Sequence, residues 1–279
     1  MKQNQALDVA QTRKEIYGID FSGAKNAGKK IWLARGESRA DGLRIDKCQR
    51  ARDFLGVAQQ RDVCLAALRD FMASRKVAAF GVDFPFGLPK ALAGGTGWAL
   101  LLRSFPKRYK TPEQFYEETH RATGGREPKR VTDVVSKTPF SPINRRIFRQ
   151  TYFGIHDVLA PLVCGRRACV LPMQKPRIGK PWILEVCPAS TLKRLRSYKP
   201  YKGREDSKRA ARRAILQTLE VTGPLAIADS LRSVVLDDPE GDALDSIIAA
   251  FATSRALFNP TVLVQHEVKG CSAEGHVYL

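Results

Sequence analysis

Residues 16–23 read IYGIDFSG, a short apolar run that ends in a single carboxylate. In an extended strand, successive side chains point to opposite faces, so Asp20 would lie on the face opposite its two apolar neighbours. Ser22 and Gly23 would then end the strand in a turn. A carboxylate in a buried strand has to be paired or to bind a metal ion, because burying an isolated charge is costly. We therefore expect Asp20 to have a charged partner or a fellow metal ligand elsewhere in the chain.

Two further predicted strands carry an acidic residue. Residues 77–84, VAAFGVDF, form a nearly unbroken apolar run that is typical of a buried central strand, and Asp83 lies near its end. Residues 182–186, WILEV, form a shorter apolar run that contains Glu185. Both carboxylates are candidates to meet Asp20.

A late helix is predicted to begin at Asp238 and Pro239 and to end at about Leu257. An acidic N-cap followed by proline is a typical helix start. Asp242 and Asp245 are three residues apart and would share one face of this helix. The positive end of the helix dipole would favour their ionised forms. A solvent-facing acidic first turn is the alternative, because the D-x-x-D pattern is short and common.

The order of the elements predicts that the carboxylates converge. Strand, strand, strand, helix and strand follow one another at residues 16–21, 31–35, 43–45, 61–75 and 77–84. This order would place the first and fourth strands side by side in one mixed sheet, so Asp20 and Asp83 would be neighbours and the late helix would pack beside them. Converging carboxylates repel one another unless cations neutralise them. Oxygen ligands select hard cations, which predicts Mg²⁺ or Mn²⁺.

The composition is that of a strongly basic globular protein. The chain has 279 residues, 43% of them hydrophobic, and a formal net charge of +19. That charge points to a polyanionic partner such as nucleic acid, although a protein that is simply basic would show it too. No apolar run approaches the ~20 residues of a membrane-spanning helix, and the first fifteen residues lack the features of a signal peptide. We therefore expect no membrane partner, a cytoplasmic location and reduced cysteines.

The chain is expected to form one domain. Residues 1–15 would be a flexible leader, and residues 16–279 a single domain with a basic, partly helical insertion at about 90–180. One helix is predicted in the insertion near residues 148–162. The basic residues of the insertion would line a groove for phosphates, or they would form an ordinary solvated face. They include Arg103, Lys107, Arg108, Arg126, Lys129, Arg130, Arg145, Arg146 and Arg149.

Four motifs follow one another in the chain: GIDFSGA at 18–24, VDFPFGLP at 82–89, EVCPA at 185–189 and DALD at 242–245. Together they resemble a domain-of-unknown-function family of predicted ribonuclease H-like nucleases, and the D-x-x-D helix is similar to that of Holliday-junction resolvases. The resemblance extends over roughly residues 16–279. It implies a ribonuclease H-like α/β fold, with a central mixed five-stranded sheet flanked by helices, and a metal-dependent nuclease activity.

The four strand-end and helix carboxylates are the predicted metal ligands. Asp20 would bridge two ions, Asp83 would hold one of them, and Asp242 and Asp245 would bind on the other side. Two ions of this kind activate water and stabilise the leaving oxygen of a phosphodiester. Glu185 would either add a catalytic ligand or form a salt bridge with a basic residue.

Six further residues are candidates to contact the substrate. Ser22 and the amide of Gly23 would touch a phosphate, and basic side chains would hold the substrate backbone. Asp133 would bind the Arg130 guanidinium instead of a metal ion. The basic candidates are Arg130, Lys199, Lys202 and Arg204.

Three classes of function fit these features. The first is a metal-dependent nuclease that hydrolyses phosphodiester bonds. The second is a non-catalytic nucleic-acid-binding protein with a degenerate ribonuclease H-like site. The third is an actin-like or sugar-kinase-like phosphotransferase, which would need two such domains and a second phosphate loop, and neither is evident in this sequence. The sequence does not distinguish RNA, DNA, a hybrid or a small phosphorylated substrate, nor does it define the oligomeric state.

Overall fold

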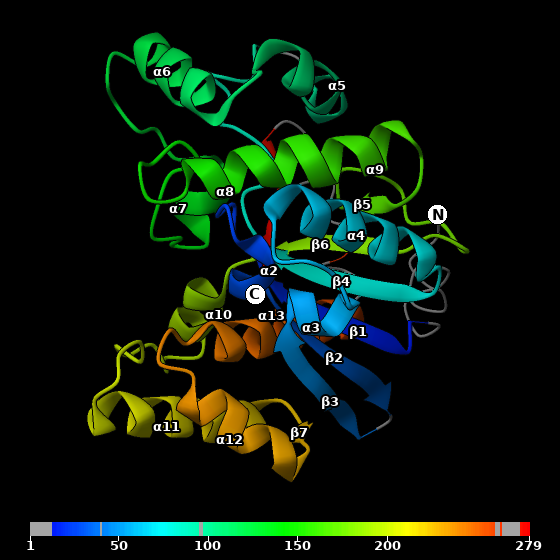
Figure 1. Cartoon of the computed structure of the whole chain (residues 1–279), viewed down its shortest axis with the longest axis vertical. Coiled ribbons are helices and arrows are strands. Elements are labelled where there is room, and N and C mark those ends of the chain that lie inside the picture. The colour runs from blue at the N-terminus through cyan, green and yellow to red at the C-terminus, as the bar shows by residue number, and fades with distance from the viewer. Residues whose placement is uncertain (1–12, 40, 95–96, 260–262, 264–273) are drawn as a thin grey trace.

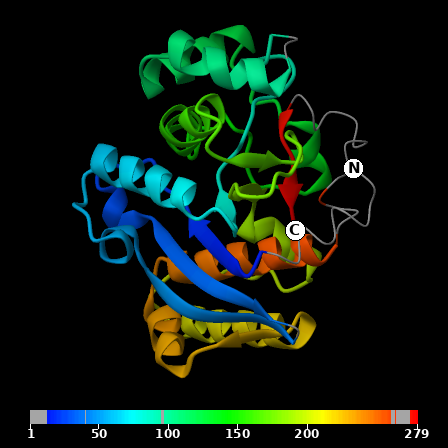
Figure 2. The ribbon, with the colours of Figure 1, turned by 90° about the vertical axis from the view of Figure 1, so that its right-hand side faces the viewer.

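The computed structural model describes residues 13–39, 41–94, 97–259, 263 and 274–279 (Figure 1). Most of the predicted leader lies outside these residues. The described chain is a mixed α/β structure in which a central sheet is covered by helices on both faces (Figures 1 and 2). None of the described helices combines the length and the apolar character needed to cross a membrane.

One mixed sheet holds the eight described strands together. They are β1 (Glu15–Asp20), β2 (Trp32–Arg39), β3 (Gly42–Arg50), β4 (Ala78–Asp83), β5 (Cys169–Leu171), β6 (Trp182–Val186), β7 (Leu225–Ile227) and β8 (Val277–Tyr278). Seven of them follow the order β5-β6-β4-β1-β2-β3-β7, and β8 pairs with β6. Strand β1 is antiparallel to β2 and parallel to β4. The first and fourth strands are therefore neighbours, as predicted.

The predicted number of five strands is wrong. The five predicted strands are β1, β2, β3, β4 and β6, and they lie next to one another in the sheet. The additional strands β5, β7 and β8 are only two or three residues long. Segments this short show no alternation of apolar and polar residues, and they become strands only because a neighbouring strand offers hydrogen bonds.

Helices cover the two faces of the sheet in separate groups (Figures 1 and 2). The first group packs side chains against Tyr17, Ile19 and Phe80, and it includes α4 (Arg61–Ser74), α5 (Trp98–Arg108), η1 (Gly154–Leu159) and α9 (Ala160–Cys164). The second packs against Ile16 and Ala79, and it includes α11 (Asp206–Thr222), α12 (Asp229–Asp237) and α13 (Asp242–Phe258). Neighbouring residues of each strand thus face different cores, as strand alternation requires.

Six other helices complete the described structure. They are α2 (Ala27–Lys30), α3 (Ala51–Leu55), α6 (Pro112–Ala122), α7 (Val131–Val135), α8 (Phe148–Phe153) and α10 (Pro188–Arg194). The predicted helix near residues 148–162 is present as α8, η1 and α9, which follow one another without a break and include a π-helical turn at residues 154–159. Helices α5 to α9 and strand β5 occupy the region predicted as an insertion.

Helix α13 approaches the sheet closely because two glycines face it. Gly18 of β1 and Gly81 of β4 are register partners. A Cβ atom at Gly18 would overlap the backbone of Ser246 and Ala250, and one at Gly81 would overlap the side chain of Thr253. Glycine inside a strand often marks such a close approach. This contact fixes α13 against the two strands that end in Asp20 and Asp83.

Candidate functional site

Two carboxylates lie side by side at the carboxyl ends of neighbouring parallel strands. Asp20 ends β1, Asp83 ends β4, and the two are register partners. Each lies on the same face of the sheet as the glycine two residues before it, which is the face that α13 covers. The predicted pairing of Asp20 with Asp83 is therefore present in the structure.

Helix α13 brings two further carboxylates in its first turn. The helix begins at Asp242, later than the predicted start at Asp238. Asp238 instead accepts a hydrogen bond from the Ala243 backbone N–H at 2.9 Å, so it satisfies a free donor of the first turn. The side chains of Asp242 and Asp245 are 17% and 6% exposed, which excludes the alternative of a solvent-facing acidic turn.

One cavity of about 600 Å³ joins these groups. Its lining residues include nine of the predicted site residues, namely Asp20, Ser22, Asp83, Arg130, Glu185, Lys199, Lys202, Asp242 and Asp245. The remaining two do not line it. Gly23 packs against the backbone of Arg149, and the side chain of Arg204 is exposed.

Burial and mutual repulsion raise the pKa values of the carboxylates. Burial is the largest cause at Asp20, whose pKa is raised well above its usual value, and the charges of Asp242 and Asp245 add to it. Burial and the charge of Asp245 raise the pKa of Asp83 to about 8. The pKa of Asp242 is raised to about 6, again mainly by burial. A nearby positive charge would therefore stabilise the ionised carboxylates of this cluster.

Lys202 supplies positive charge to two of these carboxylates. Its Nζ lies 3.1 Å from Asp242 Oδ1 and 2.8 Å from Asp245 Oδ2. Burial lowers the pKa of Lys202, but the charges of Asp245, Asp20 and Asp242 outweigh burial, and the pKa is raised overall. The Tyr201 hydroxyl also donates to Asp245 Oδ1. The ammonium group predicted to hold substrate thus contacts the carboxylates directly.

We predict that the protein without divalent ions is less stable at pH 8 than at pH 5. Between the usual carboxyl pKa of 3.8 and about 8, folded Asp83 keeps a proton that the unfolded chain has released, so stability falls as the pH rises through this range. Thermal unfolding in a chelator should show a Tm that falls by several degrees, since about 1 kcal/mol corresponds to about 2–4 °C. Asp83→Asn should flatten the profile. A Tm that rises from pH 5 to pH 8 would contradict this account.

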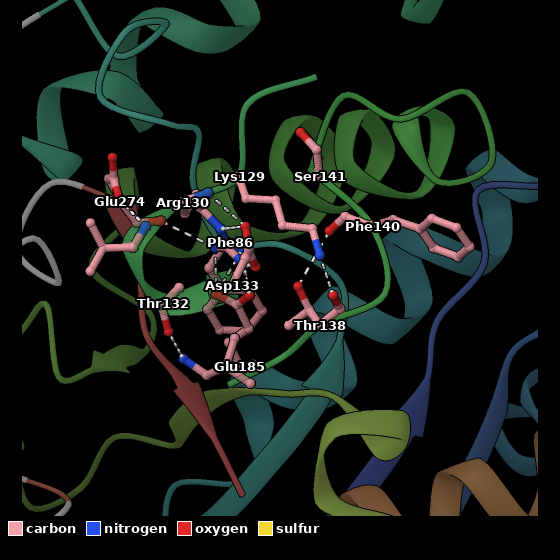
Figure 3. A network of polar contacts seen from close by, with 12 residues as sticks. Phe86, Lys129, Arg130, Thr132, Asp133, Thr138, Phe140, Ser141, Glu185 and Glu274 are labelled. Carbon is pink, nitrogen blue, oxygen red and sulfur yellow. Dashed lines mark hydrogen bonds and ion pairs between the residues drawn. The ribbon is translucent and has the colours of Figure 1, made fainter. Parts of the chain in front are cut away.

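Glu185 is engaged by Arg130 (Figure 3). Arg130 Nη1 donates to Glu185 Oε2 at 2.9 Å, Nη2 donates to Oε1, and the Phe86 backbone N–H donates to Oε2 at 3.0 Å. Arg130 also binds both oxygens of Asp133, at 2.9 and 2.8 Å. Of the two alternatives for Glu185, the structure has the salt bridge. Arg130 is 1% exposed, and its N–H groups donate to protein acceptors. It is therefore positioned to hold the cavity wall together rather than to bind a substrate phosphate.

The donor set fits a hard divalent cation chemically. Asp20, Asp83, Asp242 and Asp245 supply only oxygen atoms, which Mg²⁺ and Mn²⁺ prefer, and burial is the main cause of the raised pKa values of Asp20, Asp83 and Asp242. In the conformation described, no three His, Cys, Asp or Glu side chains among the described residues form a ready ligand group. A metal ion bound to Asp242 Oδ1 and Asp245 Oδ2 would have to displace the Lys202 ammonium group from these two oxygens.

Sequence reasoning missed three residues of the site. Tyr201 binds Asp245, Lys30 lines the cavity while its Nζ contacts Glu240 at 2.6 Å, and the Gln150 side chain donates to the Asp83 backbone carbonyl. Each belongs to a loop or helix far from its partner in the sequence. No local sequence pattern predicts such contacts, because they depend on how the helices pack around the sheet.

The fold and the site define a class: a mixed α/β protein with a carboxylate cluster at the ends of two parallel strands. A family model described as Protein of unknown function (DUF429) matches residues 18–264, a range that includes all four clustered carboxylates. The chain belongs to this family. No curated protein and no solved structure matched it in the comparisons.

Proposed function

We propose that this protein is a metal-dependent hydrolase of nucleic-acid phosphodiester bonds, built on a ribonuclease H-like fold. One observation carries the proposal: Asp20, Asp83, Asp242 and Asp245, from two strands and a helix, line a single cavity in a strongly basic protein. The neighbouring strands β3, β2, β1, β4 and β6 have the arrangement expected of that fold, and this supports the assignment.

The proposed chemistry divides the work between bound ions and the chain. Divalent ions at the four carboxylates would activate water and stabilise the leaving oxygen. The carboxylates would hold those ions, with Asp20 and Asp83 fixed by adjacent strands and Asp242 and Asp245 by the first turn of α13. Lys202, once displaced from the aspartates, would remain at the cavity as a cation for the substrate phosphate. Lys199 and Lys30 also line the cavity and would add to the same positive field.

The proposal is tested by hydrolysis of labelled single-stranded RNA, single-stranded DNA, duplex and hybrid substrates. We expect at least one to be cleaved with Mn²⁺ or Mg²⁺, and we expect a chelator to stop the cleavage and added metal to restore it. Direct Mn²⁺ binding should be measured in parallel by calorimetry. Binding of nucleic acid with no chelator-sensitive cleavage of any substrate would favour the non-catalytic alternative.

A further inference from the structure

Aromatic side chains line the acidic cavity beside the four aspartates. Phe140, which follows α7, and Tyr198, which follows α10, both line the cavity that holds the four aspartates. Tyr198 is 52% exposed although it is a large aromatic residue. Exposed aromatic side chains beside a polar centre are typical of sites that bind a flat ring.

Both rings lie next to cations, and one lysine links the segments that carry them. Lys193 Nζ lies 5.5 Å from the centre of the Tyr198 ring and donates at 2.8 Å to the carbonyl of Lys137, three residues before Phe140. The Arg146 guanidinium lies 5.4 Å from the centre of the Phe140 ring. Figure 3 shows the Phe140 ring pointing away from the buried Arg130 network. Each ring thus has a cation beside it, and the cations that line the cavity with the rings include Lys199 and Lys202.

The cavity that holds the carboxylates is too small to enclose a double helix. Asp245 is only 6% exposed, and a cavity of about 600 Å³ has the size of a small-molecule site. A duplex is much wider than such a cavity, and its bases are stacked on one another, so they offer no free face to a protein ring. A single strand is narrow and flexible, and its bases are free to stack on aromatic side chains.

We propose that the site takes nucleic acid in single-stranded form, with bases stacked on Tyr198 and Phe140 and the backbone led past Lys199 towards the four aspartates. The inference rests on the proposed function for the cleavage step, whereas the binding mode is argued from the size of the cavity and the residues that line it. A groove that combines cations with stacking rings binds single strands with little sequence preference. Strand ends, loops and unpaired segments are therefore the expected substrates.

The test is binding in a chelator, so that no cleavage takes place. Fluorescence anisotropy should compare a labelled single-stranded oligonucleotide, the duplex of the same sequence and a labelled mononucleotide. Wild-type protein should bind the single strand most tightly. Tyr198→Ala should weaken single-strand binding by about 5- to 150-fold, the range for loss of one stacked base, and should leave duplex binding unchanged. Tyr198→Phe should retain most of the affinity, because the ring and not the hydroxyl is used.

Phe258→Ala is the matched control. Phe258 is a 56% exposed aromatic residue at the end of α13 and is not among the residues that line the cavity, so its loss should not change binding. Equal losses for duplex and single strand, no loss with Tyr198→Ala, or tightest binding of the mononucleotide would overturn the inference. Tyr198-dependent binding of single strands without any metal-dependent cleavage would support the inference and reject the hydrolase. Metal-dependent cleavage that prefers duplex and is unchanged by Tyr198→Ala would support the hydrolase and reject the inference.

Discussion

Asp20→Asn is expected to lower metal-dependent cleavage by at least about 100-fold. Asp20 is the register partner of Asp83, and its pKa responds to the charges of Asp242 and Asp245, so it is electrostatically coupled to every other member of the cluster. An amide at this position keeps the shape of the side chain but removes the charge that would hold the ions. Loss of metal stabilisation worth several kcal/mol corresponds to a rate loss of two or more orders of magnitude.

The same substitution should leave the metal-free protein as stable as wild type, or more stable. At Asp20, burial and the charges of three neighbouring carboxylates together outweigh the attraction of Lys202 and raise the pKa, so a neutral side chain removes more unfavourable than favourable interaction. Circular dichroism and thermal unfolding in a chelator measure this directly. Asp62→Asn is the control, because the Asp62 side chain is 89% exposed at the start of α4. Full cleavage by Asp20→Asn would exclude the proposed ligand role, and a large loss of stability would indicate a structural role instead.

The pairing of Asp20 with Asp83 was predictable from sequence because it depends on local patterns. Each strand is a short apolar run that ends in aspartate, and the order of the elements makes the two strands neighbours. The same two strands carry a further signal. Both strands contain G-x-D, with Gly18 two residues before Asp20 and Gly81 two residues before Asp83. A glycine on the same strand face as the carboxylate indicates that another backbone approaches there, which is how α13 packs.

The remaining contacts of the site were not predictable in this way. Lys202 contacts Asp242 and Asp245 from a loop, and it precedes Asp242 by 40 residues in the sequence. Its position depends on the packing of α10, α11 and α13. The additional strands β5 and β7 depend likewise on neighbours that offer hydrogen bonds. Such features follow from tertiary packing, which composition and periodicity do not encode at any single position.

The second large effect is expected at Arg130, where Arg130→Met should lower the free energy of unfolding by about 3–5 kcal/mol. Arg130 is fully buried and binds Asp133, Glu185 and the carbonyl of Glu274 (Figure 3). Without the guanidinium, two buried carboxylates lose their counter-charge. Breaking a buried ion pair by removing one partner is costly for this reason, even where the intact pair adds little net stability.

The network also fixes three parts of the chain against one another. Arg130 opens α7, Glu185 lies on β6 next to β4, and Glu274 accepts hydrogen bonds from the backbone N–H groups of Lys90 and Val131 at 2.6 and 2.7 Å. Strand β8 then pairs with β6. Arg130→Lys should fall between wild type and Arg130→Met, because an ammonium group keeps the charge but does not bind two carboxylates in bidentate geometry.

Chemical denaturation measures these differences against a surface control. Arg167→Met removes an arginine that is 43% exposed and pairs with Asp70 at 2.8 Å, and a surface pair of this kind contributes about 0–1 kcal/mol. Glu185→Gln in the Arg130→Met background should recover part of the loss, because it removes one of the two charges left unpaired. An Arg130→Met variant no less stable than Arg167→Met would show that the buried network contributes nothing to the fold. A deficit that the second substitution does not reduce would show that lost packing, and not unpaired charge, is the cause.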